Sequence, residues 1–141
     1  APSNDRCEDP EPIFGPGEYL GSLRRATDDV AMAPERSCTG WGTAGPDVVF
    51  AYEIPQGRSA VVEVDPLPSA HDPDLDVALY AITACDDPAA TCLTGSDQAL
   101  AGASEMVRIA APPDAPRPVR LVVDSAWPNA AGDFRIIVRL E

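Results

Sequence analysis

Two runs of alternating apolar residues between Gly45 and Asp65 constrain the fold more than any other feature of the sequence. The apolar positions lie two residues apart in each run: Val48, Phe50, Tyr52 and Ile54, then Ala60, Val62 and Val64. Pro55 and Gly57 interrupt the chain between the runs. Alternation with a period of two places one face of a strand against a core, and Pro and Gly favour a turn. The stretch therefore predicts a half-buried antiparallel hairpin.

Further strand-like segments recur between turn signals along the rest of the chain. They cover residues 18–24, 75–83, 104–110, 119–124 and 134–140. The segment 75–83 has apolar residues on both of its faces, which predicts a strand that is partly buried on both sides. Residues 1–17 are polar and rich in proline, which predicts an extended N-terminal arm, and residues 93–102 are expected to form a connection. No segment keeps a helical period for three turns. The pattern predicts one all-β domain over residues 1–141, an antiparallel β-sandwich of seven or eight strands, for which a jelly roll is a common arrangement.

The charge of the chain excludes two classes of partner. There are 23 Asp and Glu residues against ten basic residues, all of them Arg, which gives a net charge of −13. A field this negative repels nucleic acid and anionic lipid, and no apolar run approaches the roughly 20 residues that span a bilayer. We therefore expect neither nucleic-acid binding nor membrane insertion. The acidity itself has two interpretations, a solvated surface or a cation site.

The four cysteines, Cys7, Cys38, Cys85 and Cys92, indicate two disulfides, for which three pairings can be drawn. A bridge between Cys85 and Cys92 would close a turn-rich loop, and Cys7 with Cys38 would then tie the arm to the chain before the predicted hairpin. A four-cysteine zinc site is the alternative, but CxxC spacing is absent. Disulfides form in oxidising compartments. We therefore expect a secreted or cell-surface protein, and a start at Ala1 without Met fits a chain whose signal segment has been removed.

Five motifs in order along the chain resemble a known family. The segment Gly45–Pro55, followed by Gly57, is similar to a strand pair of bacterial pre-peptidase C-terminal (PPC) domains, which are similar to the collagen-binding modules of bacterial collagenases. The other matching segments are Asn4–Cys7, Asp76–Tyr80, Arg120–Asp124 and Gly132–Val138. The resemblance covers nearly the whole chain. It implies a jelly-roll sandwich that is not itself catalytic and is attached to secreted proteases or displayed surface proteins.

The same resemblance implies a calcium site. Some PPC domains bind calcium where the N-terminal arm docks beside the start of the central strand, and Asn4, Asp5 and Asp47 match that motif. The family's Glu-x-Glu before the Asn-Asp pair is absent, as is its acidic residue just upstream of Asp47. Calcium takes six to eight oxygen ligands, so Asp28 and Asp29 are the candidates to complete the site.

A second acidic segment, His71–Asp76 (HDPDLD), has the alternating carboxylates of a calcium loop. It lacks the Gly and the distal Glu of an EF-hand, so a solvated acidic loop is the alternative. His71 is the only histidine, and a Ser-His-Asp triad would have to use it, yet the chain has no Gly-x-Ser-x-Gly elbow. An enzyme is therefore not expected, and a small hydrolase using His71 is the weakest hypothesis.

Trp41 and Trp127 lie in predicted loops, where binding residues gather on sandwich folds. Their rings are candidates to bind a ligand, and the alternative is that they cover loop edges. The sequence thus predicts a secreted, non-catalytic binding or accessory module with calcium as its candidate cofactor. It would adhere to an extracellular protein or polysaccharide, or assist a partner enzyme. A structural spacer in a larger surface protein is the alternative.

Overall fold

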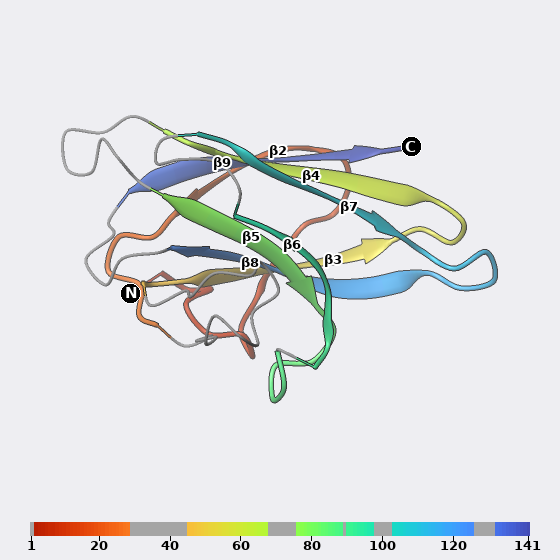
Figure 1. Ribbon diagram of the computed structural model, residues 1–141, viewed down its shortest axis with the longest axis horizontal. Helices are drawn as coiled ribbons and strands as arrows, with labels where there is room; N and C mark the ends of the chain where they lie inside the picture. The colour runs from red at the N-terminus through yellow and green to blue at the C-terminus, as the bar shows by residue number, and fades with distance from the viewer. Residues whose placement is uncertain (1, 29–44, 68–75, 89, 98–102, 126–131) are drawn as a thin grey trace.

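The computed structural model describes residues 2–28, 45–67, 76–88, 90–97, 103–125 and 132–141. Within these ranges the chain forms nine strands and no helix, so no helix there can cross a bilayer. The strands are β1 (Glu11–Pro12), β2 (Gly17–Ser22), β3 (Val48–Ile54), β4 (Ser59–Pro66), β5 (Val77–Ile82), β6 (Cys92–Ser96), β7 (Glu105–Ala110), β8 (Arg117–Ser125) and β9 (Asp133–Leu140). Two sheets, in the orders β1-β3-β8-β5-β6 and β2-β9-β4-β7, form the facing layers in Figure 1.

The strand order is that of a jelly roll. Among β2 to β9, only β5 and β6 are consecutive in the chain and also paired in a sheet. Every other consecutive pair crosses from one sheet to the other. This connectivity confirms the predicted all-β sandwich of jelly-roll type.

The predicted hairpin is wrong, although both of its strands exist. β3 pairs with β1 and β8, whereas β4 pairs with β7 and β9, so the two alternating runs lie in opposite sheets. The turn between them crosses the end of the sandwich, where Gly57 has φ 71° and donates its N–H to the carbonyl of Pro112. Alternation requires only that one face of a strand be buried. Both strands meet this requirement by lining the same core from opposite sides.

Three smaller details also differ from the predictions. Cys92–Ser96 forms the edge strand β6, where the composition predicts a connection. An edge strand pairs on one side only, so it can contain Gly95 at little cost. The predicted arm contains β1, which pairs with β3 in parallel and not antiparallel. With β1 and β6 included, the described residues form nine strands and not seven or eight.

The main core lies between the inward faces of the two sheets. The rings of Phe50 and Phe134, both fully buried, meet edge to face with their centroids 6.1 Å apart, a favourable arrangement for aromatic pairs. As predicted, the alternating residues of both runs are buried, and β5 is buried on both of its faces. Burial of this apolar surface is the main stabilising contribution to the fold.

A smaller apolar cluster lies on the outer face of the β1-β3-β8-β5-β6 sheet. Its members from the strands are Val49, Tyr80, Ile82 and Val122. Each of them alternates with residues that face the main core, so they point away from it. Cys7 from the N-terminal arm packs on this cluster. The arm therefore covers apolar surface that the sandwich alone would leave exposed.

Gly21 in β2 lies against the ring of Phe134, and a Cβ at position 21 would overlap that ring. We expect Gly21→Ala to lower the free energy of unfolding by about 1–3 kcal/mol, because a fully buried aromatic ring must shift. Urea unfolding followed by circular dichroism measures the change. Gly15→Ala is the matched control, since a Cβ there meets no atom within 4 Å. Equal stability of the two variants would contradict the packing described.

Candidate functional site

The N-terminal arm is fastened to the beginning of β3 by Asn4. The carbonyl of Asn4 accepts a 2.9 Å hydrogen bond from the N–H of Val49, and the Asn4 side-chain amide donates to the carbonyl of Val49 at 3.1 Å. Asn4 is buried. Its side chain therefore serves to hold the arm against the sheet.

Asp5 links the arm to the segment that follows β2. Its carboxylate accepts hydrogen bonds from the backbone N–H of Thr27 at 2.7 Å and from the Thr27 hydroxyl at 3.0 Å. The carbonyl of Thr27 in turn accepts from the N–H of Asp47 at 3.0 Å. Three segments that are distant in the sequence thus meet at the start of β3.

Three carboxylates converge at this junction, from Asp28, Asp47 and Asp124. One oxygen from each lies within 4.8 Å of the others. Asp47 and Asp124 are fully buried, whereas Asp28 is exposed. Val48 pairs with Val123 across β3 and β8. Asp47, just before Val48, therefore lies opposite Asp124, just after Val123. Asp28 enters from the loop that Asp5 holds.

The carboxylate oxygens of this cluster are donors of the kind that hard cations prefer. Tyr80 donates its hydroxyl to one oxygen of Asp124 at 2.6 Å, and the N–H of Ser125 donates to the other at 2.8 Å. Three carboxylates at this spacing repel one another, and a bound cation would offset the repulsion. Calcium is coordinated by carboxylate and carbonyl oxygens. The donor set therefore fits calcium, with carbonyl or water oxygens needed to complete the coordination.

The structure brings together part of the predicted calcium set and adds one residue to it. Asp28 and Asp47 are in the carboxylate cluster, Asn4 and Asp5 brace it through hydrogen bonds, and Asp29 lies outside the described residues. Asp124 is missing from the sequence-based set. The sequence places Asp124 at the end of a predicted strand, which could have marked it as a candidate. Only the antiparallel pairing of β8 with β3, however, brings that end beside Asp47.

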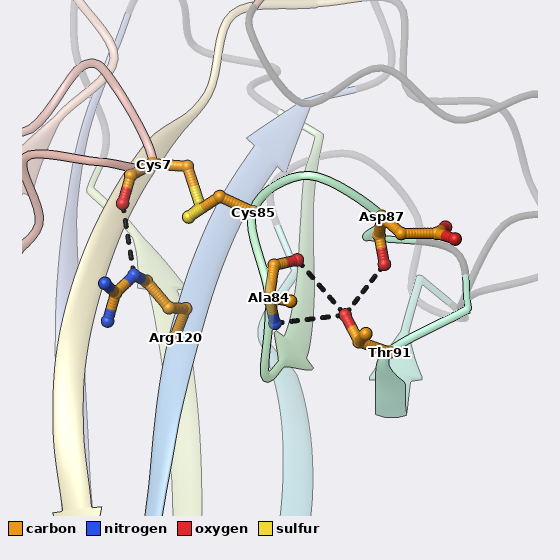
Figure 2. Close-up of a disulfide and its surroundings, with 6 residues drawn as sticks. All are labelled: Cys7, Ala84, Cys85, Asp87, Thr91 and Arg120. Carbon is orange, nitrogen blue, oxygen red and sulfur yellow. Dashed lines mark hydrogen bonds between the residues drawn. A yellow bond between two sulfur atoms is a disulfide. The ribbon is translucent and has the colours of Figure 1, made fainter.

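The arm is also held by a disulfide between Cys7 and Cys85, which Figure 2 shows beside β8. Of the three possible pairings, the one with Cys85–Cys92 and Cys7–Cys38 is therefore wrong. The loop after β5 is closed instead by Thr91, whose side chain hydrogen-bonds to Ala84 and to the carbonyl of Asp87. Cys92 is also disulfide-bonded, and Cys38 lies outside the described residues.

The physical reason for this pairing is the route of the arm. It runs over the outer face of the sheet, and Arg120 on that face donates from Nε to the carbonyl of Cys7 at 3.1 Å (Figure 2). Cys7 thereby lies 5.7 Å from Cys85, Cα to Cα, across 78 residues of sequence. Proximity in sequence gives no hint of this contact.

Replacing Cys7 and Cys85 together by Ala should lower the free energy of unfolding by about 2–5 kcal/mol, because the unfolded chain loses a long-range cross-link. Urea unfolding measures the loss. Arg120→Gln is the control, since it removes one hydrogen bond to the arm and should cost about 1 kcal/mol. A peptide map of the oxidised protein that joins Cys85 to Cys92 would contradict the pairing.

A second group of carboxylates lies at the same end of the sandwich and comprises Asp76, Asp97 and Glu105. Glu105 is buried and accepts a 2.6 Å hydrogen bond from the hydroxyl of Ser96. Burial, together with the charges of Asp76 and Glu105, raises the pKa of Asp97 to about 6. Burial and the charge of Glu105 also raise the pKa of Asp76. Of the acidic segment His71–Asp76, only Asp76 lies within the described residues.

The raised pKa of Asp97 predicts a pH dependence of stability. The folded state keeps this proton up to about pH 6, whereas the unfolded chain releases it near pH 3.8, so stability should fall as the pH rises through that window. Asp97→Asn should flatten the decrease and stabilise the protein at pH 7 by on the order of 1 kcal/mol. Urea unfolding at several pH values is the measurement. Asp114→Asn, at an exposed loop position, should leave the profile unchanged, and an unaltered slope in Asp97→Asn would refute the assignment.

Three further residues singled out in the sequence, Trp41, His71 and Trp127, lie outside the described residues. The aromatic-platform and hydrolase hypotheses that depend on them therefore stay as predictions.

Comparison with known proteins bears on the fold. No protein-family model matches the sequence, and no curated protein matches it. The structure is similar to the crystal structure of the pre-peptidase C-terminal domain of a collagenase from Bacillus anthracis. The match covers 95% of this chain and 98% of that domain, with a TM-score of 0.60 and 13% sequence identity. This chain has the fold of a pre-peptidase C-terminal domain. The five sequence motifs thus predict the PPC fold correctly.

Proposed function

We propose that this PPC-fold domain is a secreted, non-catalytic accessory module whose N-terminal arm is locked by calcium. The proposal rests on one observation above all, the convergence of Asp28, Asp47 and Asp124 where the arm meets β3. The likeness to a domain of a bacterial collagenase supports an accessory role beside a secreted enzyme. The disulfide between Cys7 and Cys85 supports an oxidising location.

The residues that would hold calcium come from three parts of the chain. Asp47 precedes β3, Asp124 lies near the end of β8, and Asp28 follows the Thr27 that Asp5 holds. Neutralising these charges would join the two central strands to the segment after β2. Because Asp5 and Asn4 hydrogen-bond to the same region, the arm would be fixed at the same time. The module would then present a stable surface to an extracellular protein or polysaccharide.

The test is thermal unfolding with millimolar calcium and with EDTA. Calcium at a hundredfold excess over its dissociation constant should stabilise the native state by about 2.7 kcal/mol. Asp47→Asn and Asp124→Asn should each abolish most of this gain, because each removes a charged ligand.

The matched control for this test is Asp114→Asn, since Asp114 lies on an exposed loop outside the cluster. That variant should keep the full calcium response. A wild-type protein whose melting temperature is the same in calcium and in EDTA would refute the calcium proposal. Loss of the response in the control would show that calcium acts through the overall negative charge and not at this junction.

A further inference from the structure

Arginine side chains gather at the end of the sandwich opposite the acidic clusters. Asp76 directly precedes Val77, which pairs with Ser125 beside Asp124, so both carboxylate groups lie at one end. The beginning of β8, at Arg117, lies at the other. The two ends of the sandwich thus differ, because carboxylates cluster at one end and arginines line the surface hollows at the other.

Two adjoining hollows of about 360 and 330 Å³ lie at the arginine end. They share Leu93, Pro112 and Arg117, so together they form one groove, which we call the Arg117 groove. Its lining also includes Arg108 and Arg120. None of the described residues that line it is acidic.

Of the three arginines in this groove, Arg117 is the one whose side chain has no partner among the described residues. Arg108 is paired with Glu141 at 3.1 Å, and Arg120 donates to the carbonyl of Cys7. Arg117 is half-buried, and its side chain makes no hydrogen bond or ion pair with the part of the chain that the structure describes. A partly desolvated guanidinium is well suited to bind a carboxylate through two parallel hydrogen bonds.

The walls of the groove are apolar and are formed by strand edges. Leu93, with 38% of its surface exposed, lies on the edge strand β6, and Ala110 ends the edge strand β7. β8 extends past the end of β5, so residues 117–119 pair with β3 alone. Edge strands present backbone groups that an added extended segment can pair with.

We propose that the Arg117 groove binds an extended acidic peptide, with a carboxylate on Arg117 and apolar side chains against Leu93 and the neighbouring prolines. The positive charge of Arg117 favours an acidic ligand. The apolar walls beside open strand edges favour an extended peptide as that ligand. A polysaccharide is disfavoured, because no aromatic ring is among the described lining residues to stack on a sugar. The inference rests on the proposed binding role, but the calcium ligand Asp124 lies near the opposite end of β8 from Arg117. The two proposals can therefore fail separately.

The probe is a capped octapeptide of alternating Glu and Val, titrated into the isotopically labelled protein with and without calcium. We expect shifts of the Leu93, Ala110 and Val119 amides and of the Arg117 Nε–H in both conditions. Arg117→Gln should weaken binding about tenfold. Leu93→Glu should also weaken binding about tenfold, because the new carboxylate would repel the carboxylates of the peptide. Arg139→Gln, on an exposed part of the other sheet, should change the affinity less than twofold.

Several outcomes would overturn the proposal. No shifts at the groove with millimolar peptide would exclude this ligand class. Equal binding of a Gln-Val octapeptide would exclude the carboxylate contact, and an equal loss in Arg139→Gln would show non-specific attraction. Shifts at the groove with oligogalacturonate but not with the peptide would assign the groove to a polysaccharide. If the peptide binds while calcium has no effect on stability, the groove proposal is supported and the calcium proposal is refuted.

Discussion

The antiparallel pairing of β3 with β8 is the interaction on which the rest of the structure depends. On one side of this pair, Phe50 and Leu121 face the main core, and on the other side Val49 and Val122 form an apolar outer surface. That surface would be exposed in a plain sandwich, and hydrophobic burial favours covering it. The N-terminal arm does so, held by the two hydrogen bonds between Asn4 and Val49 and by the Cys7 disulfide.

The same pairing separates the charges of the molecule. Its register brings Asp47 beside Asp124 at one end, and the opposite end of β8 carries Arg117. The cost of gathering buried carboxylates is offset in part by hydrogen bonds such as that from Tyr80 to Asp124. The two ends of the sandwich therefore present different side chains, a carboxylate cluster at one and a groove lined by arginines at the other. The first is where we propose calcium, and the second is where we propose the acidic peptide.

Strand-level features of the fold were predictable because they depend on local alternation. The buried faces of β3 and β4, the double-sided burial of β5 and the closing strand β9 follow from spacing alone. The PPC motifs supplied the jelly-roll connectivity. The sheet to which each strand belongs was not predictable from alternation, and the hairpin prediction failed there. β6 was missed because an edge strand needs little burial and tolerates Gly95.

The sequence by itself determined an acidic, disulfide-bonded β-sandwich and marked Asp28 and Asp47 as cation candidates. Composition and period-two spacing depend only on residues that are neighbours in the sequence, so they can be recognised without a structure. Tertiary structure alone decided that Cys7 pairs with Cys85, that Asp124 joins Asp47, and that Arg117 lines a groove. Each of these contacts joins residues far apart in the chain. They come together only when the two sheets close on the core and the arm folds over the outer face.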